Sequence, residues 1–468
     1  MARATTVTRL ADLSPLPETI ESLVREQFDR ARLPGLSVGI VQGDELVHYG
    51  GFGYADLTAK RAPDRLTLSR VASITKTFTA TAIMQLRDAG MLTLEDPLLL
   101  HVPEFAAASA LAGPLEDVTI RRMLTHHSGL TTEAPLPTWE EPRFPAMAQV
   151  LEAMPDAEVV IPADSAWKYS NFAFGLLGLV IERLTGRPYV EYIRSEILIP
   201  LGMEYTAFEL DDRLRPHFAT GYSPPVQRGG DLRVAPHVPL NSMTSAGQMY
   251  SNVEDLARWL SFQFTADGPD TCAGVLDQRS LAEMHRPVYV GPDWSWGQCL
   301  GWRATRIGDR VYLNHGGGVH GFGSQVMFNV PSKTGVIVLA NLWPTRAAGE
   351  IATAVIEAVL DARPAPSTPQ PTPSGQPSPE LTPYAGSYNA EPGIPVDVEA
   401  DGELLRLVNP DPNAYTLHAP AELHATDEKD VFRVRGGRGA GERAVFRRDA
   451  AGRIEGYLLG GFFFRRTS

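Results

Sequence analysis

A proline-rich segment divides this chain of 468 residues into two parts that we expect to fold separately. Residues 362–383 contain eight prolines among mostly small and polar side chains. Such a composition buries little apolar surface and forms a semi-rigid, extended spacer. We therefore predict one domain over residues 15–361, a linker over 362–383 and a smaller domain over 384–468. A chain of this length is long enough to build more than one core.

The larger part contains a serine and a lysine three residues apart at the start of a predicted helix. Residues 77–90 place apolar side chains on one face, and Gly90 suits the end of a helix. On the first turn of this helix, Ser73 and Lys76 would lie on the same face, within reach of each other. The positive end of the helix dipole would favour a negative charge developing at Ser73. The pair predicts a serine nucleophile that is activated by an amine.

Two other serines match nucleophile patterns, and we expect neither to be catalytic. Ser165 and Lys168 repeat the same spacing, but they lie in a stretch that reads as a loop, where no long amphipathic helix begins. Residues 35–39 match the G-x-S-x-G elbow, which requires a strand, a sharp turn and then a helix. The residues that follow read as two strands around a Gly-Asp turn, so Ser37 is expected in the middle of a strand.

Tyr169 and Asn171 form a second polar motif. They are two residues apart, so in an extended segment their side chains point the same way. A helix is predicted over residues 172–186, with either Ser170 or Asn171 as its N-cap and a glycine at its end. Alone, the two residues would be read as a packed aromatic and a helix cap. The presence of Ser73 in the same chain favours a functional interpretation.

The third motif is a histidine followed by glycines, His315-Gly316-Gly317-Gly318. Strands are predicted directly after it, over residues 325–330 and 335–340, which favours a place in a sheet over a surface turn. Consecutive glycines let a substrate backbone approach a strand edge closely and leave main-chain N–H groups free.

Together, these motifs resemble those of the serine β-lactamase and penicillin-binding-protein superfamily. The likeness is to its class C-like branch, in which Tyr-x-Asn is the second motif and His-x-Gly often replaces Lys-Thr-Gly. That branch includes D-aminopeptidases, DD-carboxypeptidases and family VIII-like carboxylesterases. The resemblance runs from about residue 34 to residue 342 and includes segments similar to the branch's landmarks, at residues 70–80, 124–130, 201–203 and 250–257. It implies an α+β fold, with an antiparallel sheet flanked by helices and a mostly helical insertion over about 96–243.

The resemblance also implies a role for each residue that matches a motif. A serine attacks the substrate carbonyl, a lysine and a tyrosine move the proton, and an asparagine donates to the acyl-side amide of the substrate. The implied catalytic residues are Ser73, Lys76 and Tyr169; the implied substrate-binding residues are Asn171, His315, Gly316 and Gly317; and the implied oxyanion hole is formed by the main-chain N–H groups of Ser73 and Gly318.

The expected function is a serine hydrolase that forms an acyl-enzyme with small peptides or amides, D-amino-acid-containing ones included. A carboxylesterase acting on small acyl esters, and a penicillin-binding protein or weak β-lactamase, are the alternatives. A non-enzymatic β-lactam sensor is least favoured because the acyl-transfer residues are all present. His315 stands where β-lactamases place a lysine. An imidazole, with an ordinary pKa of about 6.5, is mostly neutral at pH 7, so anchoring of anionic substrates such as penicillins is expected to be weak.

The C-terminal part reads as short strands with alternating apolar side chains. The alternation covers residues 396–399, 404–408, 431–435, 444–447 and 454–459. A sheet of this kind must close or pack to protect its edges, so a small antiparallel barrel is expected. Residues 384–388 resemble the opening of the lipocalin-like domain found in some peptidases of the same branch.

Composition limits the partners. The net charge of −13 disfavours nucleic acids and anionic membranes, and no apolar stretch reaches 18 residues. The eleven histidines include no metal-binding signature, so neither a metal nor another cofactor is expected, and His126 and His127 are interpreted as structural residues near the site.

Cys272 and Cys299 are too few for a disulfide framework, and a bridge between them is left open. Residues 1–10 contain no apolar leader core, so we expect a cytoplasmic protein unless a leader has been removed. A homo-oligomer is left open.

Overall fold

The computed structural model describes residues 16–139, 143–225, 230–267, 274–360, 378–391, 393–410 and 420–467. These residues form two compact units, and each contains several segments of the chain. The first, called the sheet unit, draws on Met1–Ile74, Arg194–Gly221 and Met249–Pro366. The second, called the helix–barrel unit, draws on Thr75–Ile193, Tyr222–Gln248 and Ser367–Ser468.

The sheet unit is built on an eight-stranded antiparallel sheet with the strand order β2-β1-β12-β11-β10-β9-β8-β7. Its strands are β1 (Gly35–Gln42), β2 (Glu45–Gly53), β7 (Tyr289–Val290), β8 (Trp296–Gln298), β9 (Arg303–Ile307), β10 (Arg310–Val319), β11 (Phe322–Asn329) and β12 (Thr334–Ala340). A separate two-stranded pair joins β3 (Ser69–Arg70) to β6 (Tyr250–Ser251).

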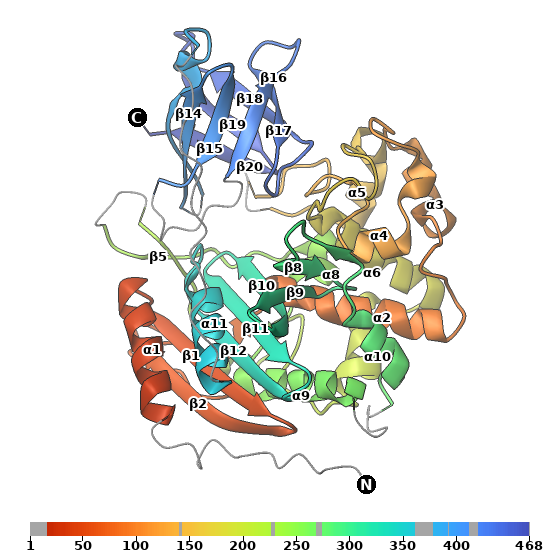
Figure 1. Cartoon of the computed structure of the whole chain (residues 1–468), viewed down its shortest axis with the longest axis vertical. Helices are drawn as coiled ribbons and strands as arrows, with labels where there is room; N and C mark the ends of the chain where they lie inside the picture. The colour runs from red at the N-terminus through yellow and green to blue at the C-terminus, as the bar shows by residue number, and fades with distance from the viewer. Residues whose placement is uncertain are drawn as a thin grey trace. The chain divides into compact units, whose positions relative to one another are not determined.

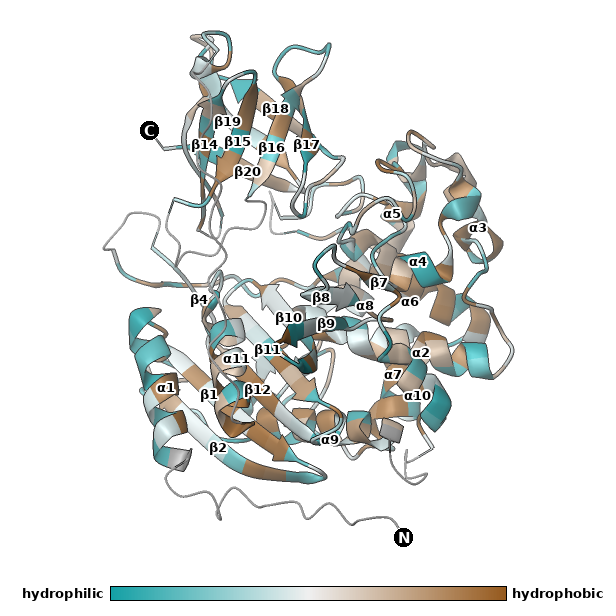
Figure 2. Ribbon diagram, viewed as in Figure 1, coloured by the Kyte–Doolittle hydropathy of each residue, from teal (hydrophilic) through white to brown (hydrophobic). Residues whose placement is uncertain are grey.

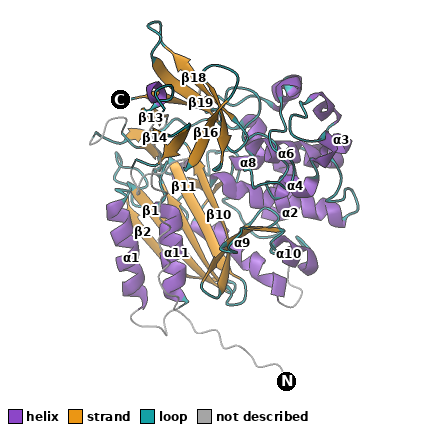
Figure 3. Ribbon diagram, turned by 45° about the horizontal axis from the view of Figure 1, so that its top comes forward, coloured by secondary structure: helices purple, strands orange, loops and turns teal. Residues whose placement is uncertain are grey.

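Helices cover this sheet, which explains why its central strands are almost continuously apolar. Every residue of β12 is buried. Helices α1 (Leu16–Arg30) and α11 (Ala347–Val359) lie side by side over the sheet (Figure 3), and α9 (Val253–Gln263) packs against β1 and β12. The sheet unit also contains α10 (Gln278–Met284). Strand β1 carries Ser37 at its centre and turns into β2, as predicted, so no helix follows that serine.

The helical part of the helix–barrel unit is organised around α2 (Thr75–Asp88) and α6 (Asn171–Thr185), which pack on each other and on α8 (Thr244–Gly247). Both predicted helices are present, each shifted by one or two residues. Ser170 is the N-cap of α6, because its Oγ accepts a hydrogen bond from the Ala173 N–H at 2.9 Å. The remaining elements are α3 (Leu98–His101), α4 (Ile120–Leu124), α5 (Met147–Glu152), α7 (Tyr189–Ile193), β4 (Tyr222–Ser223) and β5 (Arg233–Val234).

The predicted small antiparallel barrel is present, and the C-terminal strands close it with eight strands, drawn in blue in Figure 1. Brown and teal residues both occur along its strands in Figure 2, as expected for strands with one buried and one solvated face. Aromatic rings fill the interior, where the rings of Tyr457 and Phe464 stack at 4.8 Å. The strands are β13 (Gly386–Ala390), β14 (Ile394–Asp401), β15 (Leu404–Val408), β16 (Ala421–Ala425), β17 (Val431–Arg435), β18 (Arg443–Arg448), β19 (Ile454–Leu459) and β20 (Phe462–Arg466).

The helical insertion differs from its predicted bounds. We expected it to run over about 96–243, but residues 194–221 belong to the sheet unit, to which Phe218 and Ala207 are joined by bridges with Leu68 and Tyr250. Residues 362–377 of the predicted linker lie outside the described residues, and the predicted domain bounds stay a prediction. No helix in the described ranges is both long enough and apolar enough to cross a membrane.

Candidate active site

Ser73 lies in a short 3-10 turn, Ala72–Ile74, that leads directly into α2. The preceding residue, Ala72, has a φ of 48°, a left-handed conformation that is unfavourable for a residue with a side chain. Ser73 is partly exposed, whereas Ser37 is only 3% exposed and sits within a strand. Of these two serines, only Ser73 therefore combines a helix start with access from outside.

The third motif lies on β10, beside the turn that carries Ser73. A Cβ added to Gly317 would lie 2.2 Å from the Val71 carbonyl oxygen and 3.1 Å from the Ala72 Cβ, so only glycine permits this approach. The Ser324 Oγ donates to the same Val71 oxygen at 2.8 Å and ties β11 to the turn. The sheet unit thus brings Ser73 and the glycine motif together.

The edge of β10 is open where the motif lies. In the described ladder, β9 pairs with β10 only as far as Asn314, while β11 pairs with it from Leu313 to Val319. His315 Nδ1 donates to the Gly316 carbonyl at 2.7 Å, which holds the imidazole against its own strand. The sequence predicted that a substrate backbone could approach a strand edge at these glycines, and the pairing of β9 leaves such an edge.

Within the helix–barrel unit, Lys76 is completely buried and faces the second motif. Its Nζ donates to the Asn171 Oδ1 at 2.8 Å and to the Ala246 carbonyl at 2.6 Å. The same Nζ lies 5.0 Å from the centroid of the Tyr169 ring. Tyr169 and Asn171 therefore both turn toward the lysine, in agreement with the prediction that their side chains point the same way.

Two charged residues that the sequence did not indicate complete this cluster. The Asn171 Nδ2 donates to the Glu133 Oε1 at 2.7 Å, and the Trp139 Nε1 donates to the same oxygen at 3.0 Å. Arg438, from the barrel, lies 3.4 Å from that oxygen, and its guanidinium carbon is 4.6 Å from the Tyr169 ring centroid. Glu133 is a single acid in an unremarkable stretch. The only local signal for Arg438 was the density of glycines around it.

Burial and charge both act on Lys76. Burial lowers the pKa of the Lys76 amine well below its usual value, the nearby Arg438 lowers this pKa further, and Glu133 opposes them. Burial also raises the pKa of Glu133, against Arg438 and the hydrogen bond from Asn171. An amine whose pKa is lowered in this way is able to accept a proton near neutral pH, as a general base must.

The second Ser-x-x-Lys copy has a structural place. Ser165 is exposed, lies in an irregular segment and donates to the Pro162 carbonyl at 2.6 Å, and no helix begins there. Lys168 is fully buried and forms an ion pair with Glu442 of the barrel. Glu442 also accepts from the main-chain N–H of Thr132 at 2.9 Å. This pair joins the segment before α6 to the barrel.

His126 and His127 are both hydrogen-bonded, as expected for structural residues. The main-chain N–H of Ser170 donates to the His126 Nδ1 at 3.1 Å, and the His126 ring lies 4.3 Å from that of Tyr169. The His127 Nδ1 donates to the Thr125 carbonyl at 2.7 Å. His126 therefore fixes both the N-cap of α6 and the tyrosine beside it.

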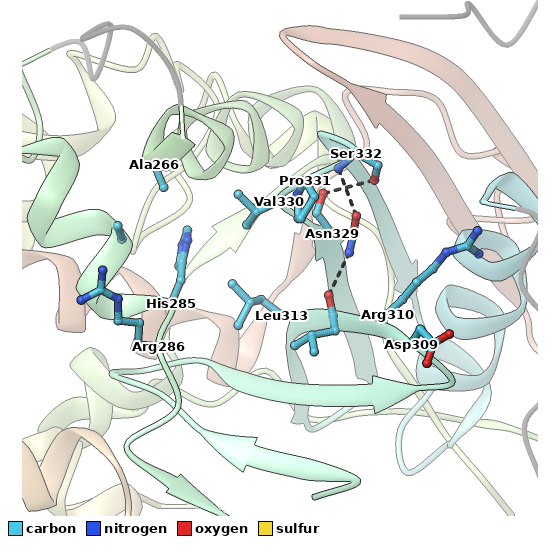
Figure 4. A pocket seen from close by; sticks show the side chains of 12 residues that line it. Ala266, His285, Arg286, Asp309, Arg310, Leu313, Asn329, Val330, Pro331 and Ser332 are labelled. Carbon is cyan, nitrogen blue, oxygen red and sulfur yellow. Dashed lines mark hydrogen bonds between the residues drawn. The ribbon is translucent and has the colours of Figure 1, made fainter. Parts of the chain in front are cut away.

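A cavity of about 750 Å³ lies elsewhere in the sheet unit and is lined by none of the predicted site residues. Figure 4 shows His285, Arg286 and Arg310 around it, with the Asn329 Nδ2 donating to the Val311 carbonyl at 2.9 Å. The Cys299 Sγ lies 3.3 Å from the main-chain oxygen of His285. Cys272 lies outside the described residues.

The antiparallel sheet with its covering helices and the helical part form the fold expected for the class of β-lactamases and penicillin-binding proteins. The chain belongs to the Beta-lactamase family, whose model matches residues 20–360. "Protein flp" of Staphylococcus aureus (strain MRSA252) is 28% identical over 325 residues, which cover 69% of this chain and 63% of that protein. The chain therefore matches somewhat less than two thirds of the length of this relative.

Solved structures share the fold. An octameric penicillin-binding protein homologue from Pyrococcus abyssi superposes with a TM-score of 0.62 and 23% identity, covering 96% of this chain and 98% of the other. A class C β-lactamase from Rhodobacter sphaeroides superposes with a TM-score of 0.61 and 20% identity, covering 73% of this chain and 99% of the other. The first structure matches more of this chain than the second does.

Proposed function

We propose that this protein is a serine hydrolase that forms an acyl-enzyme with small peptide or amide substrates, including peptides that contain D-amino acids. The observation that carries the proposal is the fully buried Lys76, whose amine donates to Asn171 at 2.8 Å and faces the Tyr169 ring at 5.0 Å. A lysine held in this way three residues after a serine in the sequence would supply the base for that nucleophile.

In the proposed mechanism, the Ser73 Oγ attacks the substrate carbonyl while its proton passes to the Lys76 Nζ. Tyr169 relays that proton to the leaving amine or alkoxide. The main-chain N–H groups of Ser73 and Gly318 stabilise the oxyanion, and each such donor lowers the barrier by roughly 2.7–4 kcal/mol. Water then attacks the acyl-enzyme by the same proton path in reverse, and Ser73 is regenerated.

A carboxylesterase acting on small acyl esters is the second candidate, and His315 favours it over a β-lactamase. The imidazole carries no fixed charge of the kind a lysine would offer to the carboxylate of a penicillin. Esters have better leaving groups than amides, so the same residues would cleave them with less help from a proton donor.

The test is intact-mass analysis after incubation with an uncharged fluorophosphonate, followed by turnover of p-nitroanilides, p-nitrophenyl esters and a penicillin. We expect one label, located on the Ser73 peptide and absent in Ser73→Ala. The matched variants Ser37→Ala and Ser165→Ala should label as the wild type does. A label on the peptide of either control serine would contradict the mechanism. Ester turnover without amide turnover would select the esterase, and a stable penicillin adduct would select a binding role.

Self-association is also part of the proposal, because the homologue from Pyrococcus abyssi is described as octameric. We propose a homo-oligomer, without assigning its size. Light scattering coupled to size-exclusion chromatography tests it, and a mass near 51 kDa, that of one chain, would contradict it.

A further inference from the structure

The barrel carries a glycine-rich loop between β17 and β18 that reaches the helical part of its own unit. This loop, residues 436–442, reads Gly-Gly-Arg-Gly-Ala-Gly-Glu. Gly441 has a φ of 81°, and a Cβ there would lie 2.3 Å from a methyl carbon of Ile161 and 3.0 Å from the Val160 carbonyl oxygen. Only glycine tolerates both the conformation and the close approach. The loop is therefore shaped to lie against the segment that leads to the second motif.

A buried ion pair anchors the end of this loop. Glu442 pairs with Lys168, and it accepts hydrogen bonds from the Thr132 N–H at 2.9 Å and the Thr132 hydroxyl at 2.5 Å. Lys168 directly precedes Tyr169 in the chain, and Thr132 directly precedes Glu133. One carboxylate from the barrel thus holds the two segments that present Tyr169 and Glu133 to the site.

The anchored loop places Arg438 at the cluster around Lys76. The Arg438 guanidinium carbon and the Lys76 Nζ lie 4.6 Å and 5.0 Å from the centroid of the same Tyr169 ring. Arg438 also lies 3.4 Å from the Glu133 Oε1, the oxygen that accepts from Asn171. A positive charge and the amine that would receive the Ser73 proton thus lie against the same tyrosine ring.

The charges of this cluster balance only when one of its bases is uncharged. Three basic side chains, Lys76, Lys168 and Arg438, share it with two acids, Glu133 and Glu442. Lys168 has its own carboxylate, and a guanidinium stays charged in proteins. Lys76 donates to two neutral acceptors, the Asn171 amide oxygen and the Ala246 carbonyl, and its complete burial disfavours the charged form of the amine. Of the three bases, Lys76 is therefore the one that we expect to give up its charge.

We propose that Arg438 is a positioning residue of the acyl-transfer site, contributed by the barrel, whose fixed charge keeps Lys76 in its uncharged, proton-accepting form. The barrel is then a working part of the active site. This inference rests on the function proposed above. In the described part of the helix–barrel unit, the charged or titratable groups that act on Lys76 or contact it include Arg438, Glu133 and Tyr169, and Glu442 is paired with Lys168.

The direction of the effect follows from the signs of the charges. The positive Arg438 lowers the pKa of Lys76, so its removal raises that pKa, and a higher pH is then needed to obtain the free amine. The negative Glu133 raises the pKa of Lys76, so its neutralisation lowers that pKa. The two substitutions should move the acid limb of the rate profile in opposite directions.

The experiment measures the second-order rate constant for labelling of Ser73 by an uncharged fluorophosphonate between pH 5 and 10. Because the probe is neutral, the substitutions do not change its electrostatic attraction to the site. Arg438→Met should move the acid limb to higher pH, so the loss of rate is several-fold larger at pH 6 than at pH 9. Glu133→Gln should move the limb to lower pH. Arg438→Lys, which retains the charge, should restore the wild-type profile.

Arg435→Met is the matched control, because Arg435 is an exposed arginine of the same barrel, three residues away. Its acid limb should coincide with that of the wild type. Coincident limbs for wild type, Arg438→Met and Glu133→Gln would overturn the inference while labelling of Ser73 still supported the proposed function. Absence of labelling at Ser73 in the wild type would overturn the proposed function itself. If Arg438→Met does not fold, as judged by circular dichroism, Glu133→Gln decides, and an unmoved limb there overturns the inference.

Discussion

His315 is the residue at which this site differs most clearly in charge from a lysine-containing one. Its imidazole, held to the Gly316 carbonyl at 2.7 Å, sits on the open edge of β10. We expect His315→Lys to raise acylation by a penicillin relative to a neutral p-nitrophenyl ester, because a fixed positive charge attracts a carboxylate more strongly in a shielded cleft than at the surface. The measurement is the ratio of the two acylation rate constants at pH 7.5.

A gain of about tenfold in that ratio corresponds to about 1.4 kcal/mol of added attraction. His315→Gln, which retains a hydrogen-bond donor without any charge, is the control and should leave the ratio near that of the wild type. An unchanged ratio in the lysine variant, with both rates measurable, would mean that this position does not face the carboxylate.

For single residues, the relative orientation of neighbours in the sequence could be predicted, but contacts between residues far apart in the sequence could not. Tyr169 and Asn171 were predicted to point the same way, and both do turn toward Lys76. The contact between Glu133 and Arg438 joins residues 305 positions apart, and no local pattern announces such a pairing. The same two residues would stand in the sequence if they lay apart on two surface loops.

Strand β10 and the turn that carries Ser73 can lie in contact because Gly317 has no side chain. A Cβ there would lie 2.2 Å from the Val71 carbonyl and 2.4 Å from the Ser324 Oγ. We expect Gly317→Ala to push the strand away from the turn, which lowers the rate of Ser73 labelling by at least tenfold and destabilises the protein by about 1–3 kcal/mol. Labelling kinetics and urea denaturation measure the two effects.

Gly349→Ala is the matched control, since a Cβ there meets nothing closer than 3.7 Å. It lies in α11, where alanine is the better helix former by about 1 kcal/mol, so its stability should be retained or slightly increased. Equal labelling rates in the two alanine variants would show that the contact between β10 and the turn does not affect the nucleophile.

Elements with a strong local pattern were predicted well, and their ends less so. The apolar stripes of α2 and α6 located both helices, but two residues could have capped α6. Ser170 and Asn171 both have side chains suited to a cap. The choice depends on tertiary contacts, because Asn171 is engaged by Lys76 and Glu133 while the Ser170 Oγ remains for the Ala173 N–H.

At the scale of the whole molecule, the predicted fold class is confirmed, and the grouping of its parts is the new information. The proline-rich segment suggested a tail that folds apart from the rest, and the barrel does close on itself. Yet by its contacts the barrel falls in one compact unit with the helical part. Trp139 stacks on Phe462 of the barrel at 5.3 Å, and Lys168 pairs with Glu442. Contacts of this kind depend on side chains far apart in the sequence, so composition could not reveal them.

The Lys168–Glu442 pair should therefore contribute to the stability of the helix–barrel unit. Lys168 is completely buried, so Glu442→Gln would leave its charge without a carboxylate, and we expect a loss of about 3–5 kcal/mol at pH 7 in the free energy of unfolding. The double variant Lys168→Met, Glu442→Leu removes both charges and should recover most of that loss. Glu455→Gln, which breaks the exposed pair with Arg465, is the control and should cost less than about 1 kcal/mol.

The pH dependence separates a lost ion pair from a packing defect. Burial lowers the pKa of Lys168, while Glu442 raises it. Without the carboxylate, the folded-state pKa falls further below its value in the unfolded chain, so over the intervening pH range the unfolded chain binds more protons than the folded one. The stability of Glu442→Gln should consequently rise with pH more steeply than that of the wild type, from pH 6 to pH 9, in urea denaturation. A packing defect alone would lower both ends of that range equally, so parallel curves would show that loss of the carboxylate does not change proton binding by Lys168 and would contradict the prediction.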